Sequence, residues 1–368
     1  MIVSGKPLER HKIDRLDQTT KQNRAKPSLH FFSYGRQALR YAIDQLFMKT
    51  TPHILVPALF CNSALELCGS AQITHYDCTT DGDVDPDQIC RMVATGEFEV
   101  LVINHLFGRT PAGRAQIYAA CQRHDVIMID DMCHCPLRSL QQTGDDDDYD
   151  VRVFSFRKFL PVPAGGAAQL HPRFQTPAPT GQIAMPASAM VKFMIERLVF
   201  ALGWRWVWRI ATSGRAGTGV SSPPQSGGDG VVTLPPARNL SPRLARVLGL
   251  ADHRAAISRH RQAHHATLAK ITAPFGGVFA AGDVPQNFAI LDPSGRLAQR
   301  MRAAGIACYN WPATELPASV RTKSQTFPNA VRVADSILCI PIHQDVTDAQ
   351  IMHIADVLRA HKAGEGVR

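Results

Sequence analysis

A lysine that precedes a glycine turn is the residue of this sequence that most directly points to chemistry. Lys158 follows the apolar run at residues 151–155, and Gly165 and Gly166 come shortly after it. The hydroxyl of Ser155 stands three residues before the lysine. An amine at a strand end, beside a turn that admits a flat ligand, is typical of a lysine that forms a Schiff base with pyridoxal phosphate. An ordinary surface lysine is the alternative interpretation.

Two carboxylates end another apolar run. Asp130 and Asp131 follow residues 126–129 and lie about 27 residues before Lys158. A carboxylate beside the pyridine nitrogen keeps that nitrogen protonated, which makes the ring of pyridoxal phosphate an electron sink. We expect Asp131 to take this role. A metal-binding or turn carboxylate is the alternative, and Asp130 is the substitute if Asp131 is not the partner.

The neighbouring Cys133-His134-Cys135 raises the question of zinc. A structural zinc site needs four ligands, and the sequence has no second Cys/His pair at suitable spacing. We therefore expect no metal site. The nine cysteines have no regular spacing, which indicates buried thiols in a reducing compartment and predicts a cytoplasmic protein.

The pattern around these residues predicts an α/β fold. Residues 28–170 alternate strand-length apolar runs with helix-period segments, which favours βαβ crossovers and a mostly parallel sheet. Ligands of such sheets bind beyond the carboxyl ends of the strands, where the lysine and the two acids lie. A helix is expected at residues 33–47, with Ser33 as its cap. Strands are expected at residues 53–56, 73–76, 100–104, 126–129 and 151–155.

The sequence pattern changes twice in the second half of the chain. Residues 213–236 form a Gly/Pro/Ser-rich loop or linker, and residues 276–361 follow a strand, helix, strand, helix order that indicates a small α+β domain. The sequence therefore predicts an N-terminal extension at 1–27, a large cofactor-binding domain at 28–270 and a small C-terminal domain at 271–368.

A long helical pattern at residues 242–270 joins these two parts. We expect its three arginines, Arg254, Arg259 and Arg261, to lie on a solvated face rather than to bind substrate.

Composition and charge exclude several classes of protein. With 45% apolar and 19% charged residues, the 368-residue chain can bury a large core, so disorder, collagen and small disulfide scaffolds are excluded. The net charge of +9 suits an anionic substrate, and nucleic acid is a minor alternative because no nucleic-acid-binding motif is present. The apolar stretch at 189–210 is interrupted by charges, so no membrane span is expected.

Five segments, in this order, resemble the DegT/DnrJ/StrS aminotransferases, which are fold-type-I enzymes that use pyridoxal phosphate. They are Gly35–Leu39, Ile54–Pro57, His105–Gly108, Ile129–His134, and Phe154–Lys158 with Gly165-Gly166. The likeness resumes at residues 334–347. The resemblance implies the fold-type-I α/β architecture. It also implies transfer of an amino group from a donor such as glutamate to a keto group, which in many members belongs to a nucleotide-linked sugar.

The resemblance also assigns roles to single residues. Lys158 matches the Schiff-base lysine, Asp131 its pyridinium partner, and His134 the position beside the ring oxygen. Ser155 matches a phosphate-binding serine, although the family commonly places that serine five residues before the lysine rather than three.

Further cofactor contacts are implied at the start of the predicted first helix. Gly35, Arg36 and Gln37 would offer backbone N–H groups to the phosphate, although the family usually has Gly-Ser or Gly-Thr where this chain has Gly35-Arg36. Phe60 is the ring available to stack on the cofactor. Asn239 loosely matches an asparagine that family members send into the neighbouring subunit's site, which implies a homodimer.

Two other function classes stay open. One is a different pyridoxal phosphate reaction on the same scaffold, such as dehydration, aldol-type bond formation or decarboxylation. The other is a non-catalytic, regulatory relative, against which the intact Lys158 and Asp131 argue. We interpret the apolar, Trp-rich segment before the loop at 213–236, together with that loop, as a subunit interface.

Overall fold

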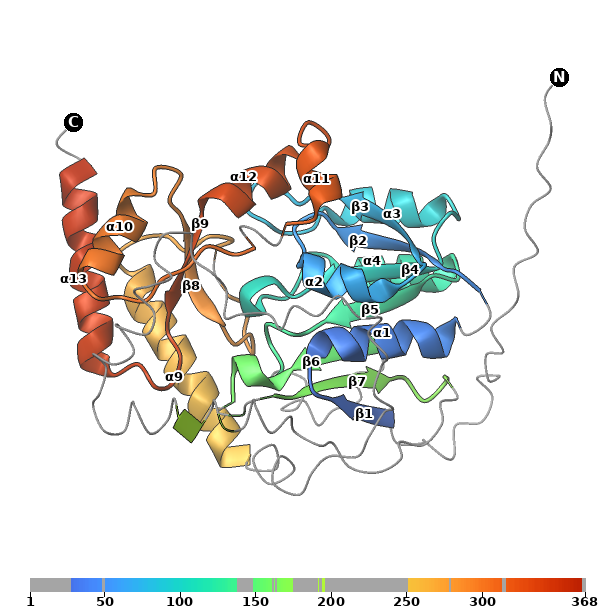
Figure 1. Cartoon of the computed structure of the whole chain (residues 1–368), viewed down its shortest axis with the longest axis horizontal. Coiled ribbons are helices and arrows are strands. Elements are labelled where there is room, and N and C mark those ends of the chain that lie inside the picture. The colour runs from blue at the N-terminus through green and yellow to red at the C-terminus, as the bar shows by residue number, and fades with distance from the viewer. Residues whose placement is uncertain are drawn as a thin grey trace.

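The computed structural model describes residues 28–47, 50–137, 148–160, 162, 164–174, 191, 194–195, 251–277, 279–312 and 316–365. These residues form a seven-stranded sheet and a two-stranded sheet with helices packed around them (Figure 1). The expectations for residues 1–27, for the loop at 213–236 and for Asn239 lie outside the described residues.

The large sheet is mostly parallel. Its strands are Ser28–Phe32 (β1), His53–Pro57 (β2), Gln72–Tyr76 (β3), Val100–Asn104 (β4), Ile127–Asp131 (β5), Val151–Ser155 (β6) and Gly166–Leu170 (β7). Their order is β1-β7-β6-β5-β4-β2-β3. Only β7 pairs in the antiparallel sense, with β1 on one side and β6 on the other. The predicted α/β fold is confirmed, and β1 and β7 are strands that the sequence pattern did not predict.

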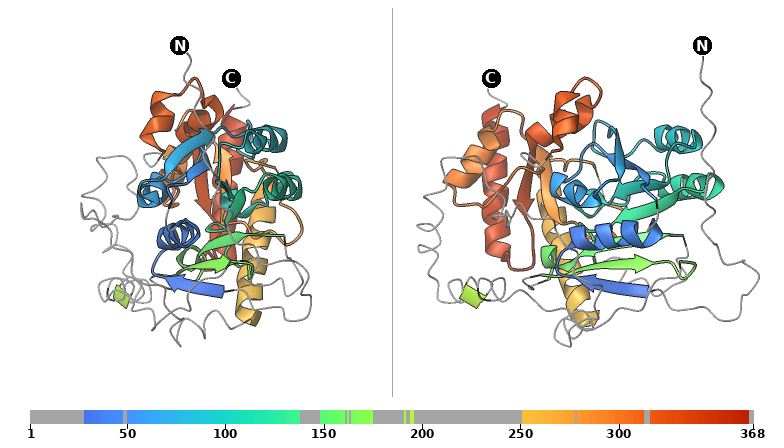
Figure 2. Two further views of the ribbon diagram at one scale, coloured as in Figure 1. Left: turned by 90° about the vertical axis from the view of Figure 1, so that its right-hand side faces the viewer. Right: turned by 45° about the vertical axis from the view of Figure 1, so that its right-hand side comes forward.

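Helices cover both faces of this sheet. The helices of the large part are Gly35–Leu46 (α1), Asn62–Leu65 (α2), Pro86–Ala94 (α3) and Arg114–Arg123 (α4), with short turns at Glu66–Cys68, Leu106–Gly108 and Phe156–Lys158. One face carries α1, whereas α3 and α4 lie on the other (Figure 2). Tyr34, rather than the predicted Ser33, is the residue before the first turn of α1.

The central strand β5 shows why neighbouring residues face different surroundings. Side chains alternate between the two faces of a strand. Ile127 and Ile129 accordingly pack in the cluster beneath α1, and Met128 packs with α3 and α4. The same alternation directs Asp131 to the α1 face and Asp130 to the α4 face.

The C-terminal part is a smaller α+β unit. Its elements are Ala251–Ala269 (α9), Asn287–Leu291 (β8), Arg296–Ala303 (α10), Ala318–Thr322 (α11), Pro328–Ser336 (α12), Ile337–Pro341 (β9) and Asp348–Glu365 (α13). β8 and β9 pair in the antiparallel sense, and their apolar residues pack against α10 and α13. The predicted domain boundary at residue 270 stays a prediction. Within the described ranges, every helix is too short or too polar to cross a bilayer.

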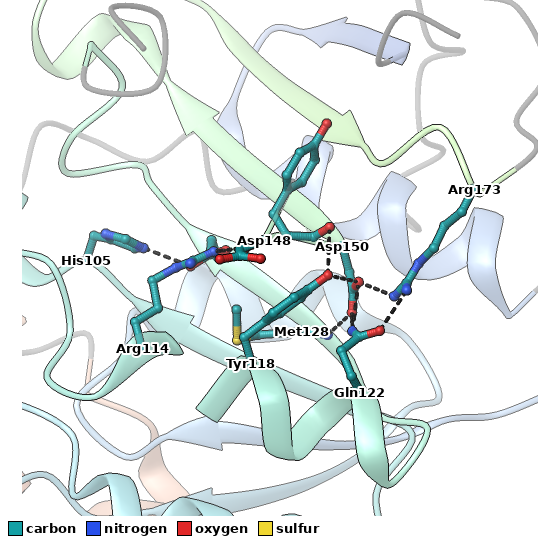
Figure 3. Close-up of polar contacts among 10 residues, drawn as sticks. His105, Arg114, Tyr118, Gln122, Met128, Asp148, Asp150 and Arg173 are labelled. Carbon is teal, nitrogen blue, oxygen red and sulfur yellow. Dashed lines mark hydrogen bonds and ion pairs between the residues drawn. The ribbon is translucent and has the colours of Figure 1, made fainter. Parts of the chain in front are cut away.

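A buried carboxylate ties the start of β6 to α4. Asp150 is fully buried and accepts hydrogen bonds from the Met128 amide at 2.9 Å, from Gln122 Nε2 at 3.2 Å and from the Arg173 guanidinium (Figure 3). Burial raises the pKa of Asp150, and these donors oppose that rise. The network fixes the strand whose other end carries Ser155.

The amino end of α1 packs directly on β6 and β7. A Cβ atom on Gly166 would lie 2.3 Å from the carbonyl carbon of Tyr34 and 2.5 Å from the Gly35 nitrogen. A Cβ atom on Gly35 would lie 2.7 Å from Cys133 Sγ and 3.2 Å from Ser155 Cβ. The helix can approach the sheet this closely only because both positions are glycine.

We expect Gly166→Ala to lower the free energy of unfolding by about 3 kcal/mol, because the new methyl group meets backbone atoms rather than a flexible side chain. Urea denaturation of wild type and variant measures the loss. Gly295→Ala is the matched control. Gly295 has a φ of +67°, and a Cβ atom there would have no neighbouring atom within 4 Å. The substitution should therefore lower the free energy of unfolding only by the strain of a left-handed alanine, about 1 kcal/mol. Equal losses in the two variants would contradict the close contact.

Candidate active site

The candidate site lies where β5 and β6 end, beneath the amino end of α1. Asp131 is the last residue of β5 and Ser155 the last of β6. Asp131 is paired in register with Val153, two residues before Ser155. Because side chains two apart share a face, Asp131 and Ser155 both point to the side that α1 covers. The structure thus brings these two predicted site residues to one corner.

The first turn of α1 offers donors to this corner. Gln37 closes the turn itself: its amide donates to the Tyr34 carbonyl at 3.1 Å, and its Oε1 accepts from the Tyr34 amide at 3.1 Å. Among the described residues, the amides of Gly35 and Arg36 have no acceptor. Free N–H groups at a helix start attract an anion. The Arg36 side chain is half-exposed, with its guanidinium 5.2 Å from the centre of the Tyr34 ring.

The two adjacent acids have different surroundings. Asp130 is fully buried and accepts hydrogen bonds from His105 Nε2 at 2.9 Å and from Arg114 Nε and Nη2 at 2.8 and 2.6 Å. Burial alone would raise the pKa of Asp130, but the bonds from Arg114 and His105 outweigh it and hold that pKa well below its usual range. This carboxylate is fully engaged on the α4 face.

Asp131, by contrast, is half-buried and open to a ligand. Its Oδ1 accepts from the Cys133 amide at 2.9 Å. No basic side chain in the described ranges forms an ion pair with it. Asp131 rather than Asp130 is therefore the carboxylate available to a cationic group on the α1 face.

His134 is a neutral hydrogen-bond donor. Its ring is 8% exposed, and its Nδ1 accepts from the Phe107 amide at 3.2 Å. Burial, and then the nearby positive charge of Lys158, lower the pKa of His134 well below its usual value. In a neutral imidazole with Nδ1 as acceptor, Nε2 carries the proton, so Nε2–H is the group that His134 can donate.

Lys158 is half-buried in the turn Phe156–Lys158 that follows β6. Two backbone hydrogen bonds fix the turn. The Phe156 amide donates to the Gly165 carbonyl at 2.9 Å, and the Gly165 amide donates to the Ser33 carbonyl at 2.7 Å. The Lys158 charge also opposes the rise that burial and Asp131 cause in the pKa of the Cys133 thiol. The Lys158 charge is thus close enough to influence Cys133 and His134, which follow Asp131 in the chain.

Two aromatic rings of the site were not predicted from the sequence. Phe107 stacks on His134 with ring centres 5.9 Å apart, and the Trp311 ring meets His134 edge-on at 5.0 Å. Phe107 has a left-handed φ of 54°, which turns the chain sharply after β4. Phe60, the predicted stacking ring, is 2% exposed and packs in the cluster beneath α1, so its contact with a cofactor stays a prediction.

One arginine of α9 differs from expectation. Arg259 is exposed and Arg254 is half-buried, but Arg261 is only 2% exposed. Its guanidinium donates to backbone carbonyls, among them that of Lys158 at 3.3 Å. The prediction of a solvated face is wrong for Arg261. Its guanidinium is buried against carbonyls that are distant in the sequence, and the local helical pattern does not show such partners.

The three residues considered for zinc have other surroundings. Cys135 is fully buried, and His134 Nδ1 is taken by the Phe107 amide. The described ranges contain no group of three or more His, Cys, Asp or Glu residues that could hold a metal ion. All nine cysteines are free thiols.

Comparisons with known proteins agree on the fold. No family model matches the sequence, and no curated protein matches it. Many solved structures do match it, and the following three are examples. A DegT DnrJ EryC1 StrS aminotransferase from Brucella abortus has a TM-score of 0.59 at 16% identity, over 90% of this chain and 85% of that one. The sugar aminotransferase CalS13 from Micromonospora echinospora has a TM-score of 0.60 at 14% identity, over 90% of this chain and 87% of that one. The putative sugar aminotransferase Spr1654 from Streptococcus pneumoniae, in its PLP form, has a TM-score of 0.63 at 14% identity, over 91% of this chain and 87% of that one.

The chain has the fold of the DegT/DnrJ/StrS aminotransferases. At these identities the likeness shows the fold alone, and it confirms the fold-type-I α/β architecture predicted from the sequence. The activity is argued below from the residues of the site.

We expect the two adjacent acids to differ in their contribution to stability. Asp130→Asn should lower the free energy of unfolding by about 3 kcal/mol at pH 7, because it breaks the ion pair with Arg114, in which the carboxylate is buried and the Arg114 side chain is only 15% exposed. Asp131→Asn should change it by less than about 0.5 kcal/mol. Urea denaturation measures both.

The pH dependence gives a further check on Asp130. Its pKa in the folded protein lies below the unfolded value of about 3.9, so its stabilisation is complete above that value and is lost as the pH falls towards the folded pKa. The difference between wild type and Asp130→Asn should therefore narrow below about pH 4. Similar losses in Asp130→Asn and Asp131→Asn at pH 7 would contradict the division of roles.

Proposed function

We propose that the protein is a pyridoxal phosphate-dependent aminotransferase. It would move an amino group from an amino-acid donor such as glutamate to the keto group of a nucleotide-linked or related keto sugar. The observation that carries the proposal is that Asp131 and Ser155 point to the α1 side at the ends of β5 and β6, directly before the Lys158 turn, in a chain with the aminotransferase fold.

The residues present fit the cofactor. Ser155 and the free amides of Gly35 and Arg36 would bind the phosphate together, since Ser155 lies so close to the start of α1 that a Cβ atom on Gly35 would be 3.2 Å from Ser155 Cβ. Asp131 has no basic partner among the described residues, so it can hold a protonated ring nitrogen. His134 offers Nε2–H to the ring oxygen. The structure of Spr1654, which shares the fold, is a PLP form, and this supports the same cofactor.

Pyridoxal phosphate, when bound, supplies an electron-withdrawing ring that stabilises negative charge at the α-carbon of the donor. Lys158 would hold the cofactor through Nζ. As a general base, the same Nζ would take up the proton that leaves the donor's α-carbon. Asp131 would keep the ring nitrogen protonated throughout. His134 would orient the ring without adding a charge, because its pKa lies well below its usual value.

The class of acceptor is proposed from the neighbours and from charge. CalS13, which shares the fold, is a sugar aminotransferase, and the net charge of +9 suits a substrate that carries phosphate groups. The direct test is to incubate the protein with glutamate, to follow the visible absorbance of the bound cofactor, and then to screen keto sugars and nucleotide-linked keto sugars for reversal of the change.

We expect Lys158→Ala to abolish the visible absorbance of covalently bound pyridoxal phosphate while the far-UV circular dichroism stays unchanged. The reason is that Nζ is the only atom proposed to bond to the cofactor. Lys270→Ala, which removes an exposed lysine at the end of α9, is the control and should behave as wild type.

In the same assay, Asp131→Asn should retain the cofactor but slow the reaction with glutamate by about 100-fold, because charge stabilisation of the reacting state is lost. A normal absorbance band and full turnover in Lys158→Ala would refute the assignment of the lysine. A near-normal rate in Asp131→Asn would refute the assignment of the acid.

We also propose a homodimer in which each subunit completes the site of the other. Three apolar side chains near the start of the Trp-rich segment support an interface: Val191, Met194 and Ile195 are 56%, 63% and 55% exposed. Adjacent exposed apolar side chains of this kind mark contact surfaces. The part of the interface assigned to Asn239 and to the loop at 213–236 lies outside the described residues.

Sedimentation at micromolar concentration should show a dimer, and Met194→Asp should shift it towards monomer, because a charge would be buried in the contact. Met352→Asp is the control, since Met352 is also exposed, at 46%, but lies on α13. A wild-type protein that is monomeric and transaminates would refute the proposed assembly.

A further inference from the structure

A buried arginine of α9 is not explained by the site described so far. Arg261 is 2% exposed, and its guanidinium carbon lies 4.2 Å from the centre of the Phe159 ring. Burial lowers the pKa of Arg261 to about 10, so the group remains charged at neutral pH. Burying a charge is costly unless it gains good partners, and Nε of Arg261 has no partner among the described residues.

The partners of this guanidinium are backbone carbonyls of two distant segments. Nη1 donates to Gln286 at 2.7 Å and to Pro285 at 3.4 Å, and Nη2 donates to Lys158 at 3.3 Å. The lysine turn is thereby tied to the chain that leads into β8. Figure 1 shows α9 running between the end of β6 and the C-terminal sheet.

The same connection continues to the histidine of the site. The Gln286 amide donates to the Phe107 carbonyl at 2.8 Å, and the Phe107 amide donates to His134 Nδ1 at 3.2 Å. Arg261 therefore links the Lys158 backbone to a path of hydrogen bonds that continues through Gln286 and Phe107 to His134.

A second side chain holds the same turn. Gln344, just after β9, donates from Nε2 to the Phe159 carbonyl at 2.9 Å. Two successive carbonyls of the lysine turn, those of Lys158 and Phe159, are thus held by side chains from the C-terminal part of the chain. Among the described residues, neither carbonyl accepts a hydrogen bond from a backbone amide of the large sheet.

We propose that Arg261 is a positioning residue that fixes the Lys158 turn relative to His134. This inference rests on the proposed function. A hydrocarbon side chain of similar size would fill the space beside Phe159 without the cost of a buried charge. The guanidinium instead spans two segments at once, which a planar fork of donors can do and an ammonium cannot. Its fork geometry thereby sets where Lys158 Nζ and the imidazole stand when the cofactor binds.

The test compares Arg261→Met, Arg261→Lys and the control Arg259→Met, which removes an exposed arginine from the same helix. Each protein is loaded with pyridoxal phosphate. The measurements are the visible circular dichroism of the bound cofactor, which reports its orientation, and the rate of cofactor release. Arg261→Met should release the cofactor about 100-fold faster, with most of the visible band lost, because a small misplacement of a reacting group has a large effect.

Arg261→Lys keeps the charge but not the fork, so it should fall between Arg261→Met and wild type, and Arg259→Met should match wild type. A wild-type band and release rate in Arg261→Met would overturn the proposal. If Arg261→Met does not fold, Arg261→Lys carries the test, because it also removes the planar fork of donors. A wild-type band and release rate in Arg261→Lys would then overturn the proposal.

A separate measurement distinguishes this proposal from the proposed function. If the wild-type protein binds no pyridoxal phosphate, the function fails, but the turn can still be probed by reductive methylation of Lys158 with formaldehyde and cyanoborohydride, followed by mass spectrometry. Arg261→Met should change the Lys158 labelling rate several-fold relative to Lys270 in the same chain. An unchanged ratio would overturn the positioning role whatever the cofactor does.

Discussion

The contact between Gly166 and the backbone of Tyr34 and Gly35 is the constraint on which the site depends. The antiparallel pairing of β7 with β6 sets Gly166 opposite Ser155, and the absence of a side chain lets the first turn of α1 rest on this pair. The free amides of that turn and the Ser155 hydroxyl therefore meet at one corner. Any larger residue at position 166 would push the helix away from the sheet. It would thereby separate the α1 amides from Ser155, the two parts of the proposed phosphate site.

Strand alternation gives two neighbouring acids opposite tasks. The Asp130 charge is balanced by Arg114, and His105 adds a hydrogen bond in the interior, so Asp130 serves to hold β5 against α4. The charge of Asp131 is balanced by no basic side chain among the described residues, and Asp131 lies half-buried at the end of the strand, on the α1 side. An uncompensated carboxylate in a half-buried position favours a cationic ligand group, and a protonated ring nitrogen is such a group.

The sequence predicted the central strands well, because apolar runs that stop at polar residues are a local signal. The observed β4 and β6 have the predicted bounds. β7 was missed, since Gly166–Leu170 is rich in small residues and is a strand only through its pairing with both neighbours. Arg261 was misplaced for a similar reason: its burial depends on carbonyls far away in the chain, which no local pattern records.

The charges of the site define one orientation for a polar, asymmetric ligand. Negative charge stands at Asp131, and the positive end of α1 stands beside Ser155. His134 contributes a donor without a charge, since the Phe107 amide fixes its tautomer and burial keeps it neutral. A flat ligand with a cationic nitrogen at one end and a phosphate at the other can satisfy both poles in only one direction. In the proposed binding mode that direction would turn one edge of the ligand to the Lys158 turn, which is why the placement of that turn by distant residues would matter for the chemistry.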